Sequence, residues 1–184
     1  MNVNIIKVAA DAPTPVIFEK IIGEKPGGGL AGNPAYDVPA GIAVSLQAGV
    51  YKPIKAYRLT KAVLVGDTTI EIAKGSGVLV GDIIGIVGKS VACSAADTTT
   101  YTTKDVVTVS LATAIALGVV LYQSAAALGT GAVPIYTPQY LTGTPIWAGQ
   151  GDQFIKLVTL AIVRKETVNA SLEVLALLPT IKAV

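Results

Sequence analysis

The sequence lacks histidine and is poor in cysteine and charge. Its 184 residues include one Cys, 14 Lys and Arg, and 12 Asp and Glu, so 14% of the chain is charged, against a usual ~25%. Without histidine the commonest general base and metal ligand is missing. A formal net charge of +2 argues against a strongly basic nucleic-acid binder. We therefore expect no enzyme, no metal site, no cofactor and no nucleic-acid partner.

The single cysteine, Cys93, has no second cysteine with which to form an intramolecular disulfide and no histidine to activate its thiol. We expect it to be a small buried or half-buried residue. Its presence as a lone thiol agrees with folding in a reducing, intracellular compartment.

The shortage of charge implies that much of the surface is apolar and is covered by something else. Apolar residues make up 52% of the chain. A compact monomer of this mass exposes on the order of 8,300 Å², so each charged residue would serve about 320 Å², close to twice the usual area. Either a membrane or other protein subunits must cover the remainder.

A membrane is the less favoured cover. The uncharged window Val106 to Ala125 is long enough to span a bilayer. However, polar residues such as Thr108 and Ser110 interrupt it, and their alternation with valines favours a strand. The chain also begins without a basic segment followed by an apolar run. The sequence therefore predicts a homo-oligomer rather than a membrane protein.

Val, Ile and Thr together form roughly a third of the chain, and these β-branched residues favour strands. About eleven short strands separated by turn signals predict an all-β sandwich or barrel-like domain. They include Thr69–Ala73 and a last strand at Leu172–Leu178, before Pro179. A Pro- and Gly-rich break divides the chain into an extended N-terminal arm with a Gly-rich connector (1–34) and a β domain (35–184).

A short internal repeat indicates two similar hairpins. The pentapeptide Val-Leu-Val-Gly-Asp occurs at 63–67 and again at 78–82, each time before an aliphatic run. A Gly-Asp pair between apolar segments is a turn signal. The two aspartates, Asp67 and Asp82, are also the most obvious carboxylate pair, although turn aspartates usually bind their own backbone.

Two glycine motifs match cofactor sites only in form. Gly27-x-Gly29-x-x-Gly32 resembles a dinucleotide fingerprint, but Pro34 prevents the helix that would hold the pyrophosphate. Gly88-Lys89-Ser90 resembles the end of a P-loop, but Ile83 stands where that motif needs its first glycine. Both motifs are interpreted as ordinary glycine loops.

A run of basic residues is the main candidate for partner contact. Lys52, Lys55, Arg58 and Lys61 recur at every third position, and residues 38–66 carry a net charge of +4 with no acid. This run could form a stripe that meets an acidic protein surface. Alternatively, the charges protect an exposed strand edge from mispairing, and a strand would place them on alternating faces.

The segment from Val38 to Ile84 resembles auxiliary virion proteins of tailed bacteriophages, most closely the head fibre or capsid decoration proteins of phages of Bacteroidetes. The shared pattern is a Gly-Asp turn, the strand Thr69–Ile72, a Lys74-Gly75 turn and the strand Val80–Ile83. The segments Leu141–Ile146 and Phe154–Arg164 are also similar. The resemblance implies a homotrimer on the capsid surface, made in the host cytoplasm and bound to the major capsid protein or other virion proteins.

The expected function is therefore that of a structural virion protein, either an oligomeric head fibre or a decoration protein. The alternative is a β-rich carbohydrate-binding or adhesion module of a tail or a cell surface. Carbohydrate binding needs exposed aromatic rings, and the candidates are Tyr136, Tyr140 and above all Trp147. Exposed aromatics distinguish the two interpretations.

Overall fold

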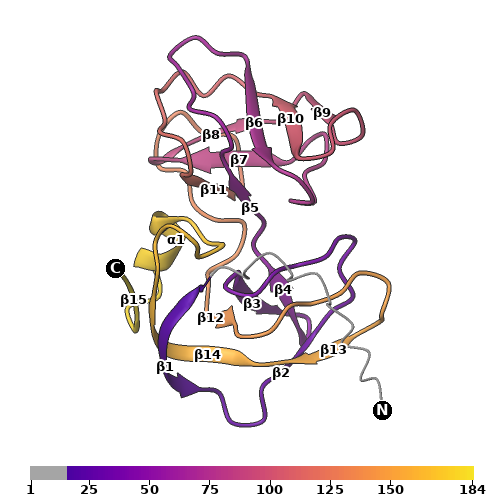
Figure 1. The fold of residues 1–184 in the computed structure, drawn as a ribbon, viewed down its shortest axis with the longest axis vertical. Coiled ribbons are helices and arrows are strands. Elements are labelled where there is room, and N and C mark those ends of the chain that lie inside the picture. Colours follow the sequence, from indigo (N-terminus) through magenta and orange to yellow (C-terminus); the bar gives the residue numbers. More distant parts are fainter. Residues whose placement is uncertain (1–15) are drawn as a thin grey trace, which may run out of the picture.

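The computed structural model describes residues 16–184, and these form two β lobes stacked end to end (Figure 1). Lobe 1 is built from residues 16–53 and 140–184, and lobe 2 from residues 56–134. The chain enters lobe 2 after β4 and returns to lobe 1 before β12, so lobe 2 is inserted between two strands of lobe 1. Residues 1–15, which belong to the predicted arm, lie outside the described residues.

Lobe 1 contains one curled sheet and the short helix. Its elements are β1 (Phe18–Glu24), β2 (Gly29–Ala31), β3 (Ala43–Gln47), β4 (Val50–Pro53), β12 (Tyr140–Thr142), β13 (Gln153–Ile155), β14 (Leu157–Val163), α1 (Leu172–Ala176) and β15 (Ile181–Ala183). The strand order is β1-β14-β12-β3-β4-β2-β13, with β15 parallel to β14. Pairs such as Leu141 with Ala43 join residues about a hundred positions apart.

Lobe 2 contains two smaller sheets. Its strands are β5 (Ala56–Arg58), β6 (Thr69–Ala73), β7 (Ile83–Ile86), β8 (Lys89–Ala92), β9 (Ala95–Asp97), β10 (Lys104–Thr108) and β11 (Val120–Gln123). One sheet has the order β6-β10-β9 and the other β5-β11-β7-β8. The window Val106 to Ala125 contributes β10 and β11 to these two sheets. In the described part of the chain, no helix is long and apolar enough to cross a membrane.

Each lobe has a core, and Tyr122 of β11 in lobe 2 packs into that of lobe 1. The lobe 2 cluster includes Tyr57, Ile72 and Leu121, each fully buried. Lobe 1 holds two clusters, one around Leu141 and Val158 and one around Ile146 and Leu157 on the other side of the curled sheet. The alternation of buried and half-exposed residues along β6 is that of a strand with one covered face.

The all-β prediction is confirmed, with fifteen described strands and a single five-residue helix. The prediction of a last strand at Leu172–Leu178 is wrong, because α1 occupies Leu172–Ala176. The Ser171 side chain accepts a hydrogen bond from the backbone N–H of Val174, which caps the first turn of the helix. The helix buries Val174 and Leu175 in lobe 1, next to β15.

The described part of the predicted arm belongs to the lobe 1 sheet. β1 pairs with β14, and β2 lies between β4 and β13. The Gly-rich connector is the tight turn between β1 and β2, and it is closely packed. A Cβ atom on Gly28 would lie 2.3 Å from the carbonyl oxygen of Ile155, and one on Gly29 2.5 Å from the Tyr51 ring.

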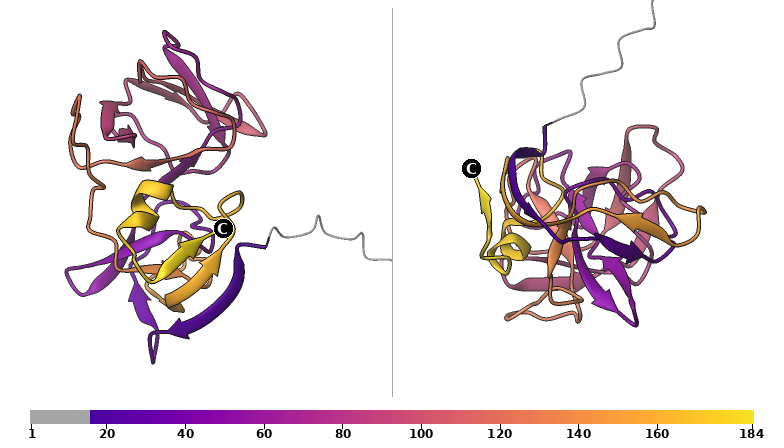
Figure 2. Two further views of the ribbon diagram at one scale, coloured as in Figure 1. Left: turned by 90° about the vertical axis from the view of Figure 1, so that its left-hand side faces the viewer. Right: turned by 90° about the horizontal axis from the view of Figure 1, so that it is seen from below.

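Besides the packing of Tyr122 in the lobe 1 core, three specific contacts join the lobes. The Arg58 guanidinium in lobe 2 donates to the carbonyl oxygens of Glu166 (2.8 Å) and Val168 (2.6 Å) in lobe 1. The backbone N–H of Val87 donates to the Glu173 carboxylate on α1 at 2.6 Å, and both views show α1 beside lobe 2 (Figures 1 and 2). The third contact packs the Tyr36 ring of lobe 1 against the backbone of Gly77 in lobe 2.

Candidate functional site

Five turns share one local structure, and two of these turns lie in the repeated pentapeptides. In each, a buried aliphatic residue precedes two further residues and a glycine with φ between 72° and 98°, a conformation that glycine adopts without strain. The five turns span residues 38–41, 63–66, 78–81, 115–118 and 146–149. In each lobe two of them meet through an antiparallel bridge, Val38 with Ile146 in lobe 1 and Val63 with Ile115 in lobe 2. The predicted turn at each Gly-Asp pair is confirmed, but the predicted hairpins are wrong, because the strands after the turns, β6 and β7, pair with β10 and with β8 and β11 and not with the segments before the turns.

We call the two residues before each glycine the turn tip. In lobe 2 the tips carry large apolar side chains that are between 60% and 73% exposed: Leu64, Val65, Leu79, Val80 and Leu117. Turn tips are ordinarily polar. Exposed apolar side chains that recur at equivalent positions are typical of a contact surface.

The two identical pentapeptides place their aspartates in different environments. Each aspartate accepts a hydrogen bond from its own turn, Asp67 from the N–H of Leu64 at 2.8 Å and Asp82 from the N–H of Leu79 at 2.9 Å. Asp82 alone gains partners from elsewhere. No contact within residues 16–184 joins the two carboxylates, so the structure does not assemble them into a catalytic pair.

Three side chains donate hydrogen bonds to the Asp82 carboxylate. The Lys55 ammonium lies 2.7 Å from its Oδ2, the Tyr57 hydroxyl donates to Oδ2 at 3.0 Å, and the Gln123 amide donates to Oδ1 at 3.2 Å. Burial raises the pKa of the Tyr57 phenol above its usual value, and the negative charge of Asp82 adds to the rise. Every oxygen is satisfied within the protein, which indicates a structural role for Asp82.

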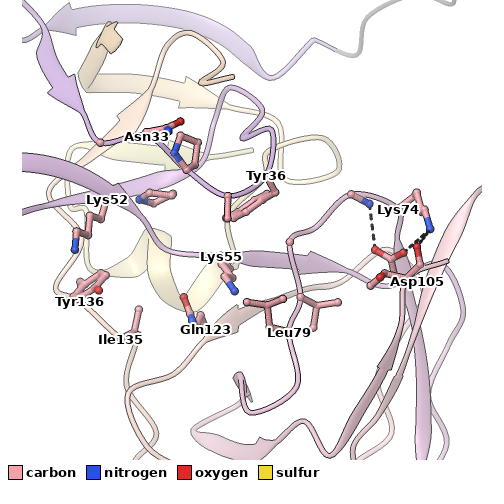
Figure 3. A pocket seen from close by; sticks show the side chains of 18 residues that line it. Asn33, Tyr36, Lys52, Lys55, Lys74, Leu79, Asp105, Gln123, Ile135 and Tyr136 are labelled. Atoms are coloured by element: carbon pink, nitrogen blue, oxygen red, sulfur yellow. Dashed lines mark hydrogen bonds and ion pairs between the residues drawn. The ribbon is translucent and has the colours of Figure 1, made fainter. Parts of the chain in front are cut away.

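A cleft of about 590 Å³ lies where the two lobes meet (Figure 3). The segment around Asn33 and Tyr36 and the strand residue Lys52 form its lobe 1 wall. Leu79 and its neighbours form the lobe 2 wall. The close-up places Lys52 beside Tyr136 at one end of the cleft, and Lys74 with Asp105 at the other.

Lys74 and Asp105 form a second ion pair at the edge of the cleft. The Lys74 ammonium lies 3.0 Å from Asp105 Oδ1, and the N–H of Gly75 donates to Oδ2 at 3.2 Å. The Asp105 side chain is almost fully buried on β10, whereas Lys74 reaches the surface. The pair fixes the loop after β6, which carries Gly77 against Tyr36.

The Tyr36 ring separates this cleft from a second hollow of about 620 Å³. Its hydroxyl is buried and has no hydrogen-bond partner within the described chain. Burial raises the pKa of Tyr36 above its ordinary value, and the negative charge of Asp82 raises it further. Trp147, at the fifth turn tip, is 53% exposed and lines the second hollow.

The predicted basic run does not form one stripe. Lys55 is largely buried on Asp82, and Arg58 donates to carbonyl oxygens at the lobe junction. Lys61 is exposed and lies 3.9 Å from the Glu71 carboxylate. Lys52 is exposed on β4 and lines the cleft. The sequence spacing found four cations, but the fold separates them and leaves only Lys52 at the cleft without a carboxylate partner among residues 16–184.

The aromatic candidates are also separated. Tyr136 lines the cleft and Trp147 the second hollow. Tyr140 packs edge-on against Tyr51, with the ring centroids 5.8 Å apart. Tyr136 and Trp147 therefore belong to two different sites, one on each side of Tyr36.

The Gly88-Lys89-Ser90 motif and Cys93 lie in and just after the β7–β8 hairpin of lobe 2. Gly88-Lys89-Ser90 forms the turn and first residues of the β7–β8 hairpin, and a strand follows in place of a helix. Cys93 is buried, its thiol donates to the carbonyl oxygen of Ala95, and burial raises the pKa of the thiol. Within the described residues no group of His, Cys, Asp and Glu is arranged to hold a metal ion.

No protein-family model, curated protein or solved structure matches this chain.

The shared turn and the cleft were not evident from the basic run or the aromatics. The turn has a sequence signal, an aliphatic residue three positions before a glycine, which is present in all five turns, and in four of them the aliphatic residue forms a bridge. The identical pentapeptides drew attention to two of these copies only. The cleft has no such signal, because its walls come from segments whose proximity depends on strand pairing between distant parts of the chain.

Proposed function

We propose that this protein is a structural virion protein, an oligomeric head fibre or decoration protein that attaches to a phage capsid. The observation that carries the proposal is the set of apolar turn tips of lobe 2, where a soluble monomer would present polar residues. The sequence resemblance to auxiliary virion proteins and the low charge of the chain point the same way.

The turn tips would act by burial against other subunits. Fully burying a Val or Leu side chain contributes about 1.5–3 kcal/mol. Leu64 and Val65, together with Leu79 and Val80, are already mostly exposed, so an interface could recover a large part of that amount at each. Because a glycine turn and a buried aliphatic residue fix the backbone at each tip, little backbone entropy remains to be lost on contact.

Replacing the first tip by Leu64→Ser with Val65→Ser tests the proposal. The wild-type chain should have an oligomeric mass by light scattering and should bind phage capsids that lack it. The tip variant should keep its circular dichroism spectrum while losing mass or capsid binding. The control is Phe154→Ser on β13, an apolar residue that is 83% exposed and outside the five turns.

The control should behave as the wild type does. A wild-type chain that stays monomeric at high concentration and does not bind capsids would refute the proposal. Equal losses in the tip variant and in the control would also refute it, because the effect would then be one of general surface polarity.

A further inference from the structure

The cleft between the lobes has the size and the walls of a small-ligand site. Its volume of about 590 Å³ lies within the ~300–1,000 Å³ typical of such sites. It forms where a connector, an inserted lobe and a curled sheet meet, and clefts between domains are frequent binding positions. The walls are mainly apolar, with a few polar groups that converge on the interior (Figure 3).

The three lysines of the cleft differ in whether a carboxylate of the protein already pairs with them. The ammonium groups of Lys55 and Lys74 lie 2.7 Å and 3.0 Å from the carboxylates of Asp82 and Asp105. Lys52 has no carboxylate within ion-pair distance among residues 16–184, and its side chain lies beside Tyr136. The cleft therefore has one uncompensated positive charge, at the end where an aromatic ring is available.

The other polar groups of the cleft suit a polyhydroxylated ring. Gln123 uses its amide N–H₂ on Asp82, which leaves its carbonyl oxygen as an acceptor for a hydroxyl group. The Lys55 ammonium lies 5.9 Å from the centroid of the Tyr36 ring and holds that ring at the cleft wall. Aromatic rings pack against the C–H faces of sugars, while amide and ammonium groups bind the hydroxyl and carboxylate edges.

We propose that this cleft binds an acidic saccharide, a sugar residue with one carboxylate, with the carboxylate on Lys52 and the ring against Tyr136. A phosphate group, with close to two negative charges, would need more than the single uncompensated cation present. The proposal goes beyond the assembly role and does not depend on it.

Titration of the full chain with monosaccharides, followed by amide chemical shifts, tests the proposal. Glucuronic acid and N-acetylneuraminic acid are the acidic probes, glucose is the neutral counterpart, and a tetraglutamate peptide and inorganic phosphate are the competing anions. We expect saturable binding of at least one acidic sugar with shifts confined to the cleft. Glucose should bind at least tenfold more weakly, since it lacks the charge-assisted contact.

Two variants test the contributions of the Lys52 charge and of the Tyr136 ring to binding separately. Lys52→Gln should weaken acidic-sugar binding about tenfold or more, whereas the matched control Lys61→Gln, also exposed but outside the cleft, should leave it unchanged. Tyr136→Leu should weaken both acidic and neutral sugars, because it removes the stacking ring and keeps the apolar volume. Circular dichroism should show that both cleft variants remain folded, although Tyr136 also packs against the lobe 1 core.

Several results would overturn the proposal. They are the absence of saturable binding by either acidic sugar, preferential binding of tetraglutamate or phosphate, and equal effects of Lys52→Gln and Lys61→Gln. Because the capsid and mass measurements use Leu64 and Val65, which lie outside the cleft, failure of the saccharide proposal would leave the assembly proposal standing, and the converse also holds.

Discussion

Replacing Gly77 with alanine should force the two lobes apart. A Cβ atom at Gly77 would lie 2.3 Å from Cγ and Cδ1 of the Tyr36 ring, where ordinary carbon–carbon contacts are ~3.5–4.0 Å. Relieving such an overlap costs about 1–3 kcal/mol in a packed site. The backbone adds to this cost, since φ is +68° at Gly77 and a left-handed conformation costs alanine roughly 1–2 kcal/mol. We expect Gly77→Ala to lower the free energy of unfolding by about 2–5 kcal/mol.

Gly75 provides the matched control two residues away. Its φ is +78° but an added Cβ would meet nothing within 4 Å, so Gly75→Ala should cost only the backbone strain of roughly 1–2 kcal/mol. Equilibrium urea unfolding followed by circular dichroism measures both variants. In a Tyr36→Ala background, the cost of Gly77→Ala should fall to that of Gly75→Ala, which isolates the contact between ring and backbone.

The reasoning would be refuted if Gly77→Ala and Gly75→Ala destabilised the protein equally while Tyr36 is present. That result would mean that the ring moves away without cost and does not fix the lobes. An undiminished cost of Gly77→Ala in the Tyr36→Ala background would equally contradict the assignment of the effect to this contact.

Two further predictions use the buried polar groups. Asp82→Ala should lower the free energy of unfolding by about 3 kcal/mol, because it leaves the Lys55 ammonium buried and unpaired. Asp67→Ala removes one turn hydrogen bond and should lower it by only about 1 kcal/mol. Equal urea midpoints for the two variants would contradict this prediction. Burial, and then the charge of Glu173, raise the pKa of Tyr122 to about 12 from an ordinary value of 10.0. The folded state thus favours the neutral phenol, so the contribution of Tyr122 to stability is complete below pH 10 and is lost as the pH rises towards 12. Tyr122→Phe should therefore make the urea midpoint fall less steeply between pH 10 and 12. An unchanged slope would contradict the raised pKa of Tyr122.

Local sequence patterns predicted those parts of the fold that depend on local chemistry. Thr69–Ala73 is a strand because its alternating isoleucines pack into the lobe 2 core. The repeated Gly-Asp pairs form turns because their glycines adopt positive φ and their aspartates accept hydrogen bonds from the backbone N–H three residues earlier. The error at Leu172–Leu178 has the same local scale, since apolar residues alone favoured a strand and the capping hydroxyl of Ser171 decided for a helix.

The candidate site depended on partners that the sequence does not reveal. Lys55 and Lys61 are equivalent in spacing, yet one is buried on Asp82 and the other lies exposed near Glu71. The carboxylates come from different strands and turns, so no count of charges along the chain could distinguish the four cations. The same holds for Tyr136 and Trp147, which lie eleven positions apart and line different hollows.

By itself the sequence determined that this chain is all-β, rich in glycine turns and too weakly charged to cover its surface in the usual way, because strand propensity, turn formation and charge are properties of residues and their near neighbours. Only the tertiary structure decided that there are two lobes, that Asp82 and Asp67 differ, and that Lys52 faces a cleft. The lobes arise from pairing between strands such as β12 and β3 or β1 and β14, which join residues about a hundred or more positions apart. The partners of Asp82 lie 25 to 41 positions away from it. Over such separations no local pattern carries information.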